Sequence, residues 1–112
     1  MILELNIKNL LKKYPIFYQK VWEVVATIPS GEVKTYSWVA AKIKNPKAVR
    51  AVGLALSKNP FLGTIPCHRV VRKDGSVGGF AKGLAKKIEL LEKEGIKIKN
   101  GFVVSMLMFR LF

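Results

Sequence analysis

Turn signals limit this 112-residue chain to short helices and strands. Residues that break helices recur along it at Pro29-Ser30-Gly31, Asn45-Pro46, Asn59-Pro60 and Lys73-Asp74-Gly75-Ser76. The stretches between these turns can each hold one short element, and no internal repeat or low-complexity tract is present. The pattern therefore predicts one compact domain over residues 1–112, built mainly from short helices.

Three helices are predicted in the N-terminal half. The first follows Pro15, at a position that tolerates proline, and ends at the first of these turns. Thr35 or Ser37 can cap the second, while Asn45-Pro46 is an N-cap and first residue for the third, which runs to about Lys58. The second and third helices would form a helix-turn-helix whose second helix reads nucleic acid. An ordinary helical hairpin that binds nothing is the alternative.

The third of these helices is expected to bury one stripe of side chains. The members of the stripe have helical spacing and are Val49, Val52, Gly53 and Leu56. Both tryptophans, Trp22 and Trp38, are expected in the core.

The C-terminal half is predicted to be more mixed. Residues 61–71 lack a helical period and are expected to be an extended segment or loop that passes through the core. A helix begins near Leu84 and is closed by Gly95. Alternating strands then flank Asn100-Gly101, which predicts a β-hairpin. Residues 105–112 are expected to form a last short helix that packs on the domain.

Positive charge is unevenly distributed along the chain. Twenty Lys and Arg residues oppose seven Asp and Glu residues, which gives a net charge of +13. No acidic residue lies between Val33 and Lys73. Such a block attracts phosphates and opposes self-association, so we expect a monomer that binds nucleic acid. A lysine-rich surface that serves only solubility or thermostability is the alternative.

The chain contains one cysteine, Cys67, and one histidine, His68, and the two are adjacent. This pair cannot form an internal disulfide or a structural zinc site, and we expect neither a metal nor a cofactor. Uncharged runs are too short to span a bilayer, and the N-terminus lacks the features of a secretory signal. We therefore expect a cytoplasmic protein without membrane contact.

The residues alone leave two interpretations of Cys67 open. A lone cysteine is usually a small buried apolar side chain. The alternative is a nucleophile, because a neighbouring histidine or basic surroundings lower the thiol pKa and favour the reactive thiolate. In an extended segment adjacent side chains point to opposite faces, so His68 could act through a water, with a carboxylate such as Glu94 orienting its ring.

The sequence around this pair resembles the O6-alkylguanine-DNA alkyltransferase family. The family's active-site signature matches Asn59-Pro60 and Ile65-Pro66-Cys67-His68-Arg69-Val70. The resemblance covers about residues 14–104 in the family's order and spacing. Its other matching segments are Gly31-Glu32-Val33 with Tyr36, residues 45–53, Gly75-Ser76-Val77-Gly78 and residues 90–95. We therefore predict a mainly α, winged-helix-like domain with a helix-turn-helix and a small β-hairpin.

The resemblance implies that Cys67 is an alkyl acceptor. It would take the alkyl group from guanine O6 by in-line displacement and keep it as a thioether, so that each molecule acts once. Cys67, His68 and Glu94, with a water, would form the hydrogen-bonded chain that produces the thiolate. Asn59 would brace the turn that carries the signature.

The resemblance also implies how the base reaches the thiol. The nucleotide is flipped out of the duplex, Arg50 fills the vacated stack, and Tyr36 crowds the flipped phosphate and donates to the guanine ring. The base pocket would include Val70, Ala81 and Leu56. Further DNA contacts are expected from Thr35, Lys47, Ala48, Gly53 and Arg69. Each key residue also has an alternative interpretation without a catalytic role. Tyr36 would be a half-buried aromatic side chain, Arg50 an ordinary phosphate contact, Asn59 a helix cap and Glu94 a member of a surface ion pair.

The chain departs from the family's common pattern both in its residues and in its length. Phe80, Ala81 and Lys82 stand where tyrosine, serine and glycine are frequent, which bears on the range of alkyl groups accepted. Typical members also carry an N-terminal domain that we expect to be absent here.

We predict a single-turnover repair protein whose partner is double-stranded DNA containing O6-alkylguanine. The alternative is an alkyltransferase-like protein, which binds the same lesions but has tryptophan at the acceptor position, where this chain has Cys67. A helix-turn-helix transcription regulator is less favoured, because it gives no reason for the Cys-His pair.

Overall fold

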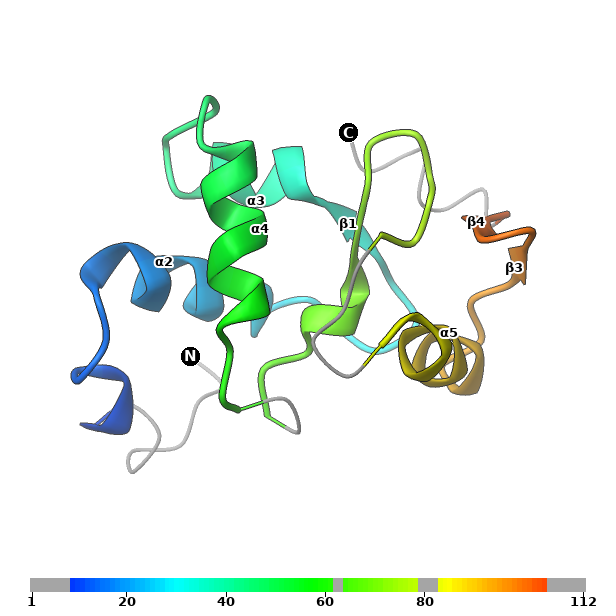
Figure 1. Ribbon diagram of the computed structural model, residues 1–112, viewed down its shortest axis with the longest axis horizontal. Coiled ribbons are helices and arrows are strands. Elements are labelled where there is room, and N and C mark those ends of the chain that lie inside the picture. Colours follow the sequence, from blue (N-terminus) through cyan, green and yellow to red (C-terminus); the bar gives the residue numbers. More distant parts are fainter. Residues whose placement is uncertain (1–8, 62–63, 79–82, 105–112) are drawn as a thin grey trace.

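The computed structural model of the protein describes residues 9–61, 64–78 and 83–104 and is mainly helical (Figure 1). The helices are α2 (Ile16–Val25), α3 (Tyr36–Lys42), α4 (Val49–Ser57) and α5 (Leu84–Lys93), and η1 (Cys67–Arg69) is a single 3₁₀ turn. The predicted fold class, mainly α with a small β-hairpin, is confirmed. The last helix predicted over residues 105–112 lies outside the described residues, as do residues 79–82 and the first eight residues of the chain.

Two short strand pairs complete the fold. Strand β1 (Lys34–Thr35) runs parallel to β2 (Val70–Val71), with Lys34 opposite Val70 and Thr35 opposite Val71. Strand β3 (Ile98–Lys99) is antiparallel to β4 (Phe102–Val103). The turn of this hairpin has φ of 54° at Asn100 and 79° at Gly101, the positive values that an Asn-Gly turn adopts readily. The predicted hairpin is confirmed.

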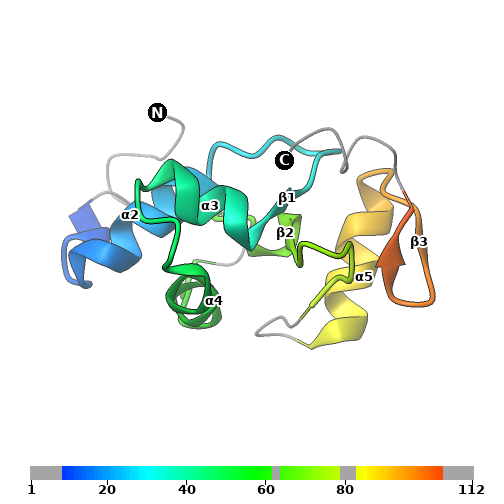
Figure 2. The same ribbon diagram turned by 90° about the horizontal axis from the view of Figure 1, so that it is seen from above.

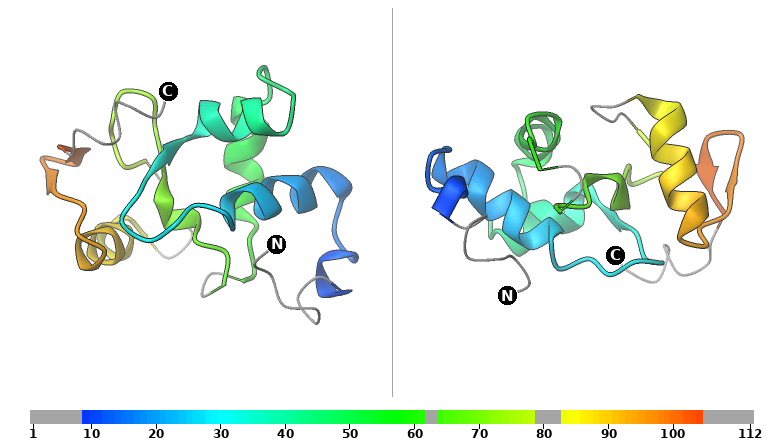
Figure 3. Two further views of the ribbon diagram at one scale, coloured as in Figure 1. Left: turned by 180° about the vertical axis from the view of Figure 1, so that it is seen from behind. Right: turned by 90° about the horizontal axis from the view of Figure 1, so that it is seen from below.

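Strand β2 lies between two apolar clusters. Consecutive strand residues point to opposite faces, and Val70 packs in a cluster with residues of α2, α3 and α4, while Val71 packs in a second with Leu91 and Val103. Figure 2 shows the same division, with α2, α3 and α4 on one side of the β1–β2 pair and α5 with the hairpin on the other. The 3₁₀ turn η1 leads directly into strand β2, between the two clusters (Figure 3).

The helix-turn-helix is formed by α3 and α4, which pack on each other. Thr35 Oγ1 accepts a hydrogen bond from the Trp38 backbone N–H at 3.0 Å, so Thr35 is the N-cap of α3, one of the two predicted caps. Trp22 is fully buried, as predicted, and its Nε1–H donates to the Ala55 carbonyl at 2.9 Å. Trp38 is only half-buried, because its ring lies at the edge of the core beneath the ammonium groups of Lys34 and Lys42.

The predicted start of α4 at Asn45-Pro46 is wrong. The Ala48 N–H donates to the Asn45 carbonyl at 3.0 Å, so residues 45–48 form a turn and the helix begins at Val49. An Asn-Pro pair is equally suited to the first two positions of a β-turn, and here that geometry occurs. The predicted stripe is also partly wrong, since Val49 is 37% exposed and Gly53 half-buried, while Ala55 is buried with Val52 and Leu56.

The other observed elements differ from the predicted ones in two places. Helix α2 ends at Val25, before the predicted Pro29 turn, because the chain tightens through hydrogen bonds such as Ile28 N–H to the Val25 carbonyl. The segment 61–71, predicted to be non-helical, contains η1, a turn too short to leave a period in the sequence. Within the residues that the structure describes, no helix has the length and apolarity needed to cross a membrane.

Candidate active site

The backbone before Cys67 makes two tight turns in succession. Pro66 has φ −81° and ψ 68°, and the Cys67 N–H donates to the Ile65 carbonyl at 2.8 Å, which is the geometry of an inverse γ-turn. The Arg69 N–H then donates to the Pro66 carbonyl at 3.0 Å and closes η1. Cys67, His68 and Arg69 therefore project from a helical turn, so the alternation expected of an extended strand does not apply to them.

Asn59 fixes this loop with its side-chain amide. Its Oδ1 accepts from the Phe61 N–H at 2.7 Å, while its Nδ2 donates to the Ile65 carbonyl at 3.1 Å and to the Cys67 Sγ at 2.8 Å. The Asn59 side chain is itself buried. One amide thus joins the end of α4, the backbone before the γ-turn and the sulfur.

Cys67 lies in an apolar environment. It is 4% exposed and belongs to the same cluster as Val70, and its Sγ is 3.8 Å from the Leu56 carbonyl. Burial raises the pKa of the thiol from 9.0 to about 11, although the Asn59 hydrogen bond and the charge of Lys87 act in the opposite direction. The sequence-based nucleophile interpretation expected a lowered thiol pKa, so the structure differs on this point.

The raised pKa predicts the pH dependence of thiol reactivity in the protein without DNA. Only the thiolate attacks, and its fraction grows as pH rises, so alkylation of Cys67 by iodoacetamide should accelerate about tenfold per pH unit toward pH 11. Mass spectrometry over a pH series measures the rate. A plateau beginning near the ordinary thiol value of 9.0 would contradict the dominance of burial.

His68, the residue that follows Cys67, forms a partly buried pair with Glu94. His68 Nε2 is 3.1 Å from Glu94 Oε1, and their side chains are 8% and 16% exposed. Burial lowers the pKa of His68 and outweighs the opposing effect of Glu94, so the ring is neutral at pH 7. Because an ionised carboxylate only accepts, Nε2 carries the proton and Nδ1 is the basic atom of the neutral ring.

Arg69 holds the carboxylate of this pair. Its Nε and Nη2 groups both donate to Glu94, and Nη1 donates to the Ile28 carbonyl at 2.7 Å. Burial acts to raise the pKa of Glu94, but the hydrogen bonds from Arg69 and His68 outweigh it and the net shift is downward. The guanidinium is thus directed into the protein, and the DNA contact expected of Arg69 stays a prediction.

A cavity of about 550 Å³ borders the same pair. Its lining includes His68, Arg69 and Glu94 together with Pro66 and residues 26–29. This opening gives the His68–Glu94 pair access to solvent. In the described residues, no group of three or more His, Cys, Asp or Glu side chains is placed to hold a metal ion.

Tyr36 is the first residue of α3, and its hydroxyl interacts electrostatically with the Cys67 thiol. Burial raises the pKa of its hydroxyl, Arg72 lowers it, and Cys67 raises it further. A Cβ atom added at Gly78, where φ is +73°, would stand 3.2 Å from the Tyr36 hydroxyl. Glycine therefore permits the loop after β2 to lie against this hydroxyl.

The residues predicted to bind DNA are not all on the surface. Arg50 and Lys47 are exposed at and before the start of α4, and Ala48 and Gly53 are half-buried beside them. Thr35 is 3% exposed and serves as the cap of α3, so the structure assigns it a structural role, and its contact with DNA stays a prediction.

The base-pocket residues are placed only in part. Leu56 and Val70 are both buried in the cluster that contains Cys67. Ala81 lies outside the described residues, as do Phe80 and Lys82.

Sequence reasoning missed Lys87, which enters the site from α5. Its side chain is fully buried, and its Nζ donates to the Val70 carbonyl at 2.7 Å. Glu94, for which a surface ion pair was the alternative expectation, pairs with Arg69 and His68. A signal was present, because Lys87 lies one helical turn before the buried Leu91 and therefore on the inner face of α5.

Together these features define a helix-turn-helix domain with a buried cysteine, which accepts a hydrogen bond from an asparagine amide and is followed in sequence by the histidine of a His–Glu pair. Residues 16–96 match the family model described as 6-O-methylguanine DNA methyltransferase, DNA binding domain. The chain belongs to this family.

Individual relatives give the same result. The chain is 46% identical over 83 residues to a methylated-DNA–protein-cysteine methyltransferase of Methanosarcina mazei, covering 74% of this chain and 52% of that protein. It is 49% identical over 89 residues to a probable methylated-DNA–protein-cysteine methyltransferase of Acanthamoeba polyphaga mimivirus, covering 80% and 58%. The chain thus spans about half the length of most such relatives.

Solved structures extend the likeness to the fold. The chain is similar to OGT of Mycobacterium tuberculosis in complex with DNA, with a TM-score of 0.71 and 43% identity, over 72% of this chain and 50% of that one. It is also similar to Atl1 of S. pombe in complex with damaged DNA containing O6-carboxymethylguanine, with a TM-score of 0.69 and 32% identity. In that case 75% of this chain and 80% of the other are covered.

Proposed function

We propose that this protein repairs DNA by transferring the alkyl group of O6-alkylguanine to Cys67. The observation that carries the proposal is the position of the sulfur. The only cysteine of a chain in this family is fixed by an Asn59 amide 2.8 Å away and lies next in sequence to a histidine paired with Glu94. A cysteine that served only as core filler would need neither feature.

The proposed chemistry is a single displacement. A bond forms between the Cys67 sulfur and the alkyl carbon while the carbon–O6 bond breaks, and its electron pair stays on the guanine. The thiol proton passes to the neutral His68 ring, directly or through water, and the departing guanine takes up one proton. The net change is transfer of the alkyl group from oxygen to sulfur. No step restores the thiol, so each molecule acts once.

The helix-turn-helix supplies the proposed DNA surface. Arg50 and Lys47 are exposed at the start of α4, where they can meet phosphates or the vacated base stack, and Ala48 and Gly53 allow close approach. Tyr36 is the first residue of α3 and interacts electrostatically with Cys67, which supports its proposed contact with the flipped nucleotide. Thr35 and Arg69 would act mainly by holding α3 and Glu94 in place.

Two further properties are proposed from charge and composition. The net charge of +13 opposes self-association, which supports a monomer, and it favours DNA as the partner. A cytoplasmic location would place the protein with that partner.

Lesion binding without transfer is the second candidate function. One observation favours it, namely that the match to Atl1 covers 80% of that chain but about half of the methyltransferase relatives. The raised pKa of Cys67 is also compatible with a thiol that does not react.

One experiment separates the two functions. The protein is incubated with a duplex containing O6-methylguanine and with the unmodified duplex, and its intact mass is then measured. A gain of one methyl group that peptide mapping assigns to Cys67, and only with the lesion, supports transfer. Unmodified protein that still binds the lesion would support the second function.

A further inference from the structure

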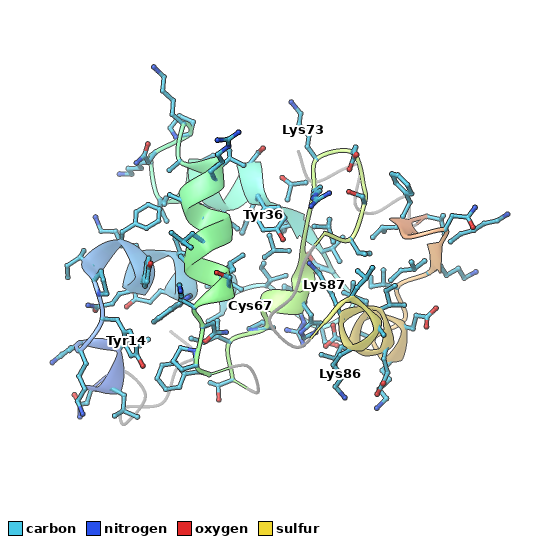
Figure 4. All side chains as sticks on the ribbon, viewed as in Figure 1. Tyr14, Tyr36, Cys67, Lys73, Lys86 and Lys87 are labelled. Carbon is cyan, nitrogen blue, oxygen red and sulfur yellow. The ribbon has the colours of Figure 1, made fainter. Side chains whose placement is uncertain are left out.

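The Lys87 side chain is fully buried although lysine side chains are almost always exposed, and its charge acts on Cys67. Figure 4 shows the contrast with its neighbour on α5: Lys87 points toward the centre of the molecule, where Cys67 and Tyr36 lie, and Lys86 points away. The Lys86 side chain is 43% exposed and pairs with Glu89. Two adjacent lysines thus have opposite environments, and only one of them faces the site.

The Lys87 ammonium is held by groups that surround the cysteine. Its Nζ donates at 2.7 Å to the carbonyl of Val70, the residue that follows η1, and lies 5.9 Å from the centre of the Tyr36 ring. Ionisable groups that interact with it include Cys67 and His68 from η1 and Arg72 from the segment after β2. A carbonyl dipole and an aromatic face both stabilise a cation, so the contacts suit the charged form of the amine.

We propose that Lys87 is a positioning residue that supplies the positive charge stabilising the Cys67 thiolate. This inference rests on the proposed function in one respect, because the thiolate matters only if Cys67 is a nucleophile. Asn59 offers the sulfur a dipole, and Lys87 adds a full charge in surroundings that water does not screen. His68 and Glu94 would remove the proton, and Lys87 would stabilise the anion that is left.

The electrostatics of the pair agree with this geometry. Burial lowers the pKa of Lys87 to about 8, while Cys67 acts to raise it. In return, the charge of Lys87 lowers the pKa of Cys67. Because about 8 lies above neutral pH, most molecules carry the charge there despite the cost of burying it.

Lys87→Met tests the proposal, because methionine has similar length but no charge. The rate at which iodoacetamide modifies Cys67 is measured in the protein without DNA, below about pH 8, where Lys87 is charged. Loss of the charge should raise the thiol pKa by about one unit and slow the reaction about tenfold. The matched control is Lys86→Met, which should react like the unchanged protein. Equal rates for a folded Lys87→Met variant and the unchanged protein would overturn the proposal.

A second pair of variants tests the proposal if Lys87→Met does not fold. Should circular dichroism show that Lys87→Met is unfolded, the same rate is compared in Lys87→Arg and Lys87→Gln. Retained reactivity with arginine and loss with glutamine support a role for charge, whereas equal rates in the two variants overturn it. The outcome is also independent of repair. A slower thiol reaction without any methyl transfer in the unchanged protein would refute the proposed function and leave this inference standing.

Discussion

Cys67→Ala is expected to abolish methyl transfer while leaving binding to the lesion duplex within a few-fold of the unchanged protein. The chain has no other cysteine that could accept the group. The hydrogen bonds that shape η1 come from the backbone, and Asn59 keeps its bonds to Ile65 and Phe61, so the loop should persist. Intact mass after incubation with the O6-methylguanine duplex measures transfer, and a gel-shift titration measures binding.

Two controls make the Cys67→Ala result decisive. Cys67→Ser keeps a polar atom in place of the sulfur and should be equally inactive, since a serine hydroxyl is a far weaker nucleophile than a thiolate. The thermal midpoint of both variants should fall only modestly, because a single buried atom is removed or exchanged and the cavity left behind is small. A mass gain in either variant would place the acceptor elsewhere. Loss of lesion binding in both would give Cys67 a role in the interface.

Asn59→Asp is expected to reduce the reactivity of the Cys67 thiol about a hundredfold. The substitution retains the oxygen that accepts from the Phe61 N–H but replaces the Nδ2 donor, 2.8 Å from the sulfur, with a carboxylate oxygen. A negative charge at such a distance raises the thiol pKa by about two units or more. Modification by iodoacetamide measures the effect without DNA, and the transfer rate should fall in parallel.

Asn45→Asp is the matched control for Asn59→Asp. Asn45 also precedes a proline but is exposed, so the same charge is added where water screens it. Thiol reactivity in Asn45→Asp should match that of the unchanged protein. If Asn59→Asp reacted as fast as Asn45→Asp, the amide would not stabilise the thiolate, and its role would be limited to bracing the loop.

Local features of the fold could be predicted from the sequence. The hairpin depends on Asn100 and Gly101, and the cap of α3 on Thr35, so a few neighbouring residues determine each structure. The α4 boundary could not be predicted, because Asn45-Pro46 suits both a helix start and a turn. The choice between them depends on how residues 43–48 leave α3, which packing decides.

The candidate site was predicted less completely than the fold. The signature brought Asn59, Cys67 and His68 into one hypothesis, and the structure places Asn59 on the sulfur and Glu94 on the histidine ring. The DNA contact of Arg69 stays a prediction, while the observed direction of its side chain depends on contacts with Glu94 and Ile28, which are far away in the sequence. Lys87 was missed because a charge on the inner face of a helix is explained only by the groups it meets after folding.

The β1–β2 pair sets the distance between the helix-turn-helix and the sulfur. Thr35 both pairs with Val71 and caps α3, and Val70 directly follows η1, so no flexible connection separates α3 from the reactive loop. This strand pair, only two residues long, therefore fixes the distance from α3 to the sulfur. Under the proposed function, selectivity then depends on distance: a flipped base meets the sulfur only when it is displaced from the helix-turn-helix by a fixed amount. Lengthening the junction by one residue would change which bases qualify without altering a single atom that touches them.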